Sequence, residues 1–228
     1  MRMGRYMVLL TPLALVFFGN VSAVTAEDEA VQTGSQSSDA SDVPRRHFRL
    51  RHVAELDPEE SARIYDLVKG ALAKGYAASG FKGAGSYQSL TRYNDAPYES
   101  SSHGNHYLNN YANDIARDYG KFEQGAPLPE GSIIFKDSFS VTEIQQRFSG
   151  TKSRQIVLGP LFIMRKMAKG FNRVTGDWQY IQIQPDGEIL GMTGGKGAEH
   201  VEYCIGCHLA REQLDHLYFI PEARRRPQ

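Results

Sequence analysis

The sequence is poor in cysteine, has no surplus of either charge and has no apolar segment long enough to span a membrane. Cys204 and Cys207 are the only cysteines among 228 residues, so all thiol chemistry in this chain involves this pair. Lysine plus arginine and aspartate plus glutamate both total 26. A protein that binds nucleic acid normally shows a basic surplus on one face. We therefore expect no nucleic-acid partner.

The first residues have the form of a secretory signal. Arg2 and Arg5 precede an apolar run from Met7 to Phe18, which is shorter than the ~20 residues that cross a bilayer. The small residues that follow contain a Val-x-Ala sequence ending at Ala26. The pattern predicts a signal peptide over residues 1–26 and a protein exported to the periplasm, with an uncleaved membrane anchor as the alternative.

Residues 27–45 are acidic, rich in serine and almost without large apolar side chains. Such a segment cannot bury enough surface to offset its ordering entropy, so we predict a disordered leader there. One folded domain is expected over residues 46–228. The arginines at 224–226 are expected to form a solvated tail rather than a binding site.

Local signals predict two helices. Asp57 can cap a helix that begins at Pro58, and apolar residues follow at helical spacing from Ile64 to Leu72. A second helix is expected over Asn113–Tyr119.

The other regular segments are expected to be strands. The segments 131–137, 161–164 and 178–184 are rich in β-forming residues, and the last runs into the turn sequence Pro-Asp-Gly at 185–187. Strands without intervening helices predict an antiparallel sheet. The expected class is α+β, a mainly antiparallel β-sheet with flanking helices.

Cys204-Ile205-Gly206-Cys207-His208 is the motif whose spacing dictates chemistry. Two thiols three residues apart on a helical turn can each add to a vinyl group of one haem, and the adjoining imidazole can bind the iron. We interpret Cys204 and Cys207 as the attachment points of haem c and His208 as the proximal ligand. The motif would then lie on a C-terminal haem-attachment helix that can continue through residues 209–219.

Three other interpretations of the cysteine pair are open. A redox-active pair of the thioredoxin type is expected beside a βαβ unit, which the pattern does not predict. A zinc site needs further ligands, and the chain has no second cysteine pair. A structural disulfide suits an oxidising compartment. For a sixth iron ligand, Met164, Met167 and Met192 are the candidate thioethers, although Met164 lies in an apolar strand pattern typical of a core.

The sequence resembles the cytochrome P-460 family, which includes the cytochromes c′-β. The resemblance covers about residues 102–219 and consists of an ordered set of segments: His103-Gly104 with Tyr111-Ala112-Asn113, Pro129 to Asp137, Gly176-Asp177-Trp178 with Pro185-Asp186-Gly187, Cys204 to His208, and Asp215 to Phe219.

The resemblance implies a mostly antiparallel β fold, commonly homodimeric, with a five-coordinate haem open to small ligands. It also implies that Lys136, on the matching strand, is the residue that can be joined covalently to the porphyrin. His103 and His106 are candidates for a distal residue that donates a hydrogen bond or moves protons. Asp215 is a candidate for orienting the proximal imidazole.

Three functions follow from these expectations. The first is a haem oxidoreductase that oxidises hydroxylamine, with a redox partner protein to take up electrons and His106 or His103 as the catalytic base. The second is a protein that binds nitric oxide in the same pocket. The alternative is a six-coordinate c-type electron-transfer cytochrome without catalytic activity.

Overall fold

The computed structural model describes residues 50–145 and 152–227. The predicted signal peptide (1–26), the predicted leader (27–45) and the first residues of the predicted haem domain (46–49) lie outside the described residues. Within the two described ranges, no helix has the length and apolar character needed to cross a bilayer.

Helix α1 (Pro58–Ala77) begins where the sequence predicts. A carboxylate oxygen of Asp57 accepts a hydrogen bond from the Glu60 amide at 2.7 Å, and this bond satisfies one of the free donors of the first turn. The helix buries side chains spaced three or four residues apart, which places them on one face. They are Ser61, Tyr65, Val68, Leu72 and Tyr76.

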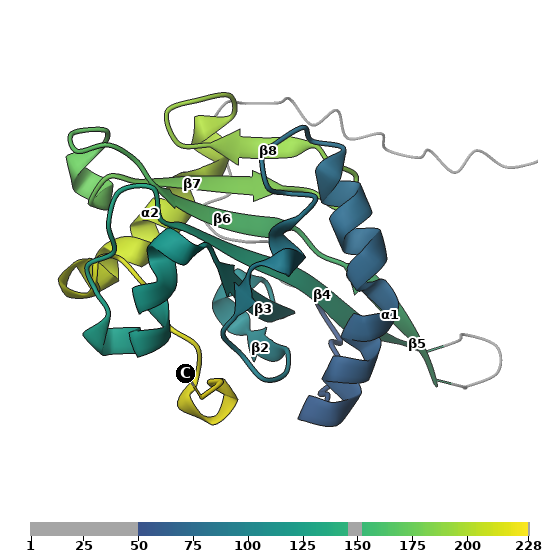
Figure 1. Ribbon diagram of the computed structural model, residues 1–228. Coiled ribbons are helices and arrows are strands. Elements are labelled where there is room, and N and C mark those ends of the chain that lie inside the picture. The colour runs from purple at the N-terminus through teal and green to yellow at the C-terminus, as the bar shows by residue number, and fades with distance from the viewer. Residues whose placement is uncertain (1–49, 146–151, 228) are drawn as a thin grey trace, which may run out of the picture. The chain divides into compact units, whose positions relative to one another are not determined.

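Eight strands form a single sheet in which every strand pair is antiparallel. The strands are β1 (Thr91–Arg92), β2 (Tyr98–Ser100), β3 (His106–Ala112), β4 (Ile133–Gln145), β5 (Lys152–Leu158), β6 (Leu161–Lys166), β7 (Trp178–Ile183) and β8 (Ile189–Met192). Their order is β1-β3-β4-β6-β7-β8, with β2 paired to β3 and β5 paired to β4 (Figure 1). The predicted α+β class with a mainly antiparallel sheet is confirmed.

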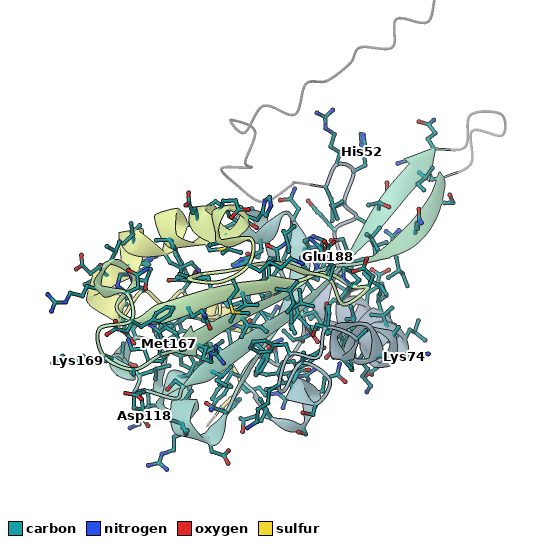
Figure 2. All side chains as sticks on the ribbon, turned by 90° about the horizontal axis from the view of Figure 1, so that it is seen from above. His52, Lys74, Asp118, Met167, Lys169 and Glu188 are labelled. Atoms are coloured by element: carbon teal, nitrogen blue, oxygen red, sulfur yellow. The ribbon has the colours of Figure 1, made fainter. Side chains whose placement is uncertain are left out.

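The two faces of the sheet pack against different parts of the chain, because neighbouring residues on a strand point to opposite sides. On β4, Phe135 and Phe139 belong to the core that α1 covers. Ile134, the neighbour of Phe135 on the opposite face of the sheet, belongs to a second core, against which Cys204 and Ile205 of α2 (Glu202–His208) pack. Figure 2 shows α1, which carries the labelled Lys74, and the yellow C-terminal helices on opposite sides of the strands.

Two segments expected to be helical differ from the prediction. The segment expected over Asn113–Tyr119 forms 3₁₀ turns over Asp114–Gln124, interrupted by non-helical geometry at Phe122. The Asn113 side chain explains the tight start, because its oxygen accepts hydrogen bonds from the amides of Ala116 (3.1 Å) and Ile133 (3.0 Å).

The expected continuation of the motif helix through residues 209–219 is wrong. After α2 the chain makes 3₁₀ turns over Leu209–Leu214 and then leaves helical geometry. Asp215 and His216 follow with φ of 54° and 61°, in the left-handed region. The other short 3₁₀ segments are Tyr87–Ser89, Ser101–His103, Arg173–Thr175, Ala198–Val201 and Glu222–Arg224.

Candidate functional site

A cleft between the sheet and α2 brings together most of the residues singled out in the sequence. It encloses about 730 Å³, part of it open to solvent. Cys204, Cys207 and His208 line it from α2, and Lys136 lines it from β4. The remaining lining residues are mainly apolar or aromatic: Ser102, His103, Ile134, Phe162, Ile163, Met164, Tyr180, Ile181, Tyr203 and Tyr218.

The thiols of the motif are free in the described structure. Cys204 is half-buried and Cys207 is exposed. The antiparallel sheet offers no βαβ unit beside them within the described ranges, so the surroundings differ from those of a thioredoxin-like pair. The described residues also include no group of three or more metal-binding side chains, which a zinc site would need.

His208 is held in an orientation that suits an axial ligand. Its side chain is buried, and its Nδ1 lies 2.5 Å from the backbone carbonyl oxygen of His216. A carbonyl can only accept, so Nδ1 carries the proton and Nε2 is the nitrogen with a lone pair in the neutral ring. The rings of Tyr180 and Tyr218 lie 5.0 Å and 5.2 Å from the imidazole, measured between ring centroids.

The carbonyl that orients His208 is presented by the left-handed residues Asp215 and His216. Left-handed geometry is strained for residues other than glycine, so it needs anchors. The Asp215 carboxylate pairs with Lys166, and its second oxygen accepts from the Leu128 amide at 2.9 Å. The Asp215 carbonyl accepts from the indole of Trp178 at 2.8 Å.

This arrangement changes the role expected for Asp215. Its carboxylate makes its contacts with Lys166 and Leu128, and the hydrogen bond to His208 comes from the neighbouring backbone. Asp215 therefore fixes the turn that carries the acceptor and is not itself the acceptor.

Lys136 is a buried cation on the sheet side of the cleft. It is 5% exposed, and on its two sides it pairs with Asn110 of β3 and Phe162 of β6. Burial lowers the pKa of its amine to about 8, because a buried ammonium loses hydration. A substantial fraction of the side chain is then a neutral amine near pH 8.

The two candidate distal histidines occupy different places. His103 lines the cleft, where its Nδ1 lies 2.8 Å from the Ser100 hydroxyl and its ring stacks edge-on against Phe162 at 4.9 Å. His106 does not line it, and hydrogen-bonds the Ser140 hydroxyl at 2.8 Å.

The position of His106 follows from the strand spacing. It precedes Asn110, the partner of Lys136, by four residues on β3, which is about 13 Å along the strand. Burial lowers its pKa to about 4, so the ring is neutral at pH 7. Of the two histidines, only His103 is placed to reach a ligand in the cleft.

A family model described as cytochrome P460 matches residues 85–219, which include every candidate site residue named above. The chain belongs to the cytochrome P460 family. Membership implies a haem cofactor and an iron centre. A search of the curated proteins found no match.

The cleft is chemically suited to haem. Its walls are largely apolar, and two thiols and an imidazole project from one short helix into the same space. Of the three methionines considered as ligands, only Met164 lines the cleft. Met192 packs against the α1-side core instead.

Sequence reasoning missed two residues of this site. Tyr180 lies in a segment for which only a strand was predicted, but it lines the cleft, and its buried hydroxyl has no hydrogen-bond partner among the described residues. Lys166 was not singled out, although it anchors the turn formed by Asp215 and His216. The β-forming residues of 178–184 predicted a strand, but they could not show what either face of that strand contacts.

Proposed function

We propose that this chain is a mono-haem c-type cytochrome whose haem is bound through Cys204 and Cys207, with His208 as the proximal iron ligand. The observation that carries the proposal is that these three side chains and Lys136 line one cleft. When bound, the haem supplies a redox-active iron with a position for a small ligand.

The best-supported activity is redox chemistry on a small nitrogen compound, with hydroxylamine oxidation as the reaction. His103 lies at the cleft, where its imidazole can accept or donate a proton. Lys136 presents a buried amine whose lowered pKa favours the neutral, nucleophilic form. We infer that this amine is the group that would be joined to a porphyrin carbon in this chain, a bond that replaces one N–H and one C–H and therefore needs a two-electron oxidant.

Nitric oxide binding is the second candidate, because the sheet side of the cleft is formed largely by apolar side chains such as Ile134, Phe162 and Met164. An uncharged diatomic molecule needs little more than space and an open iron position. A six-coordinate electron carrier is the alternative, with Met164 or His103 as the residue nearest to supply a sixth ligand.

The test of the haem proposal uses protein made in a host that attaches haem to cytochromes. Wild type should keep a peroxidase stain on a denaturing gel, whereas the double variant Cys204→Ala/Cys207→Ala should lose it. His208→Ala should keep the stain, because the thioethers remain, but change the ferrous spectrum. His200→Ala, at a half-buried histidine outside the cleft, is the control. A wild type without stain contradicts the proposal.

Steady-state oxidation of hydroxylamine with an artificial electron acceptor separates the enzyme from the nitric oxide protein. Turnover above that of free haem supports the enzyme. A high-spin ferrous form that binds carbon monoxide excludes a stable six-coordinate carrier. Lys136→Arg keeps the charge but removes the primary amine, so it should abolish any tryptic peptide that is joined to the porphyrin through this position.

We further propose export to the periplasm, a homodimeric state and a redox partner protein. The signal-like pattern of residues 1–26 supports export. Intact mass of the secreted protein should show cleavage after Ala26, and light scattering should show the mass of two chains. An uncleaved product or a monomer contradicts the respective proposal.

A further inference from the structure

The arginines at 224–226 do not form the solvated tail expected from the sequence. The Arg226 amide donates to the Tyr93 carbonyl at 2.9 Å, and the Arg224 carbonyl accepts from the Asp95 amide at 3.0 Å. The guanidinium of Arg225 donates to both carboxylate oxygens of Glu123, at 2.7 Å and 3.0 Å. This segment is therefore fixed against the body of the domain.

The docked segment brings Arg226 to a second pocket, which encloses about 970 Å³, part of it open to solvent. Lys69 of α1 and Arg92 of β1 line this pocket with it, and Tyr65 and Tyr111 line it as well. None of the residues that line it also lines the haem cleft.

The charge of this second pocket is positive. Lys69, Arg92 and Arg226 are opposed in the lining by a single carboxylate, Asp66, which lies 2.8 Å from Lys69. Partial burial and the positive charge of Arg92 lower the pKa of Arg226, although Tyr111 and Asp95 act in the opposite direction, so the two guanidinium groups repel each other. An anion between them would remove this repulsion.

The tyrosine hydroxyls of the pocket are already committed to an interior acceptor. Tyr65 donates to the buried carboxylate of Asp137 at 2.6 Å, so in its 2.6 Å contact with Tyr111 it must accept. The Tyr111 proton is thus directed inward. A ligand in the pocket would take its hydrogen bonds from the guanidinium and ammonium groups, which only donate.

We propose that this pocket binds a small multivalent oxyanion through Arg92, Arg226 and Lys69. Guanidinium groups match the paired oxygens of a phosphate or a carboxylate, and two of them on one concave surface favour an anion with more than one charge. Inorganic phosphate and a dicarboxylate such as succinate share this chemistry. The proposal is independent of the haem chemistry, because the two sites have no lining residue in common.

The test titrates the haem-loaded protein with phosphate and, separately, with succinate at constant ionic strength, and follows binding by calorimetry. We expect saturable binding of at least one of them, and the tighter of the two identifies the ligand class. Arg226→Gln should weaken binding by about tenfold. This variant keeps the backbone bond to Tyr93 and changes an exposed side chain, so it should fold.

Arg92→Gln should weaken binding to a similar extent. Arg63→Gln is the matched control, because Arg63 is an exposed cation on α1 that does not line the pocket and pairs with Glu59. The proposal is overturned if neither anion binds saturably, or if Arg226→Gln binds as tightly as wild type. An unchanged haem spectrum in every variant would show that the result does not depend on the haem site.

Discussion

Lys136 combines two properties that seldom occur together in a lysine: it is buried, and its amine faces a functional cleft. The folded pKa of about 8 lies below the ordinary value of 10.5. Between these values the unfolded chain binds more protons than the folded chain, so the stability of the wild type rises with pH in this window.

Lys136→Met should therefore stabilise the haem-free chain at pH 7 by up to about 3 kcal/mol, because it removes a buried charge. The advantage should shrink between pH 8 and pH 10.5. Urea unfolding at pH 7 and pH 10 measures both values. Lys74→Met, at an exposed position of α1, is the control and should show neither effect. A stabilisation by Lys136→Met that does not depend on pH would contradict the lowered pKa of Lys136.

His106 should make the protein sensitive to acid. Its folded pKa of about 4 lies below the ordinary 6.5, so between these values the unfolded chain binds more protons and stability is lost as the pH falls. His106→Gln can keep the hydrogen bond to Ser140 and cannot titrate. From pH 6.5 to pH 4, the unfolding free energy of this variant should therefore fall by up to about 3 kcal/mol less than that of the wild type. Equal losses in both proteins would refute this explanation.

At the scale of single elements, the turn formed by Asp215 and His216 is the part of the site that depends most on distant segments. Lys166 of β6 and Asp215 are 13% and 8% exposed at their side chains, so their ion pair is nearly buried. Removal of one partner leaves the other charge buried and unpaired.

Lys166→Met should cost about 3–5 kcal/mol of unfolding free energy. Because the turn carries the acceptor for His208, the variant should also shift the reduction potential of the haem-loaded protein upward, since a weaker hydrogen bond makes the imidazole a poorer donor. Denaturant unfolding and redox titration measure the two effects. Lys152→Met, in an exposed pair with Glu143, is the control and should change stability by no more than ~0.5 kcal/mol.

The elements that the sequence predicted well are those that local signals define. Asp57, Pro58 and the stripe of α1 lie within a few turns of one another, and the motif of α2 has a fixed spacing. Four strands have weak local patterns: the short strands β1, β2 and β8, and β5, which pairs only with β4. The strands with which they pair decide their conformation.

The parts of the site that the sequence could not predict depend on backbone atoms and long-range pairs. The acceptor for His208 is a carbonyl, which every residue carries, so no residue type identifies it. Lys166 and Asp215 are separated by 49 residues, and only the fold brings them together. The local pattern predicted the strand that carries Lys136, but only the family resemblance indicated Lys136 itself as a site residue.

For the whole molecule, the burial of α1 against the sheet should supply much of the stability. Leu72 is fully buried in this interface, whereas Leu67 on the same helix is 77% exposed. Leu72→Ala should destabilise the domain by about 2–5 kcal/mol. Leu67→Ala should stay within ~0.5 kcal/mol, and similar losses in both variants in a denaturant titration would refute this packing.

The alternation along β4 has a consequence for how the chain tolerates change. Lys136 points into the cleft, and its neighbour Asp137 points to the opposite face, where Tyr65 and Tyr87 donate to its carboxylate. One residue inserted just upstream in this strand would move Lys136 into the place of Asp137, beside the Tyr65 and Tyr87 hydroxyls, and would turn the Asp137 carboxylate to the cleft side of the sheet. A substitution at either position changes one side chain. An insertion of one residue would move every following side chain of β4 to the opposite face of the sheet.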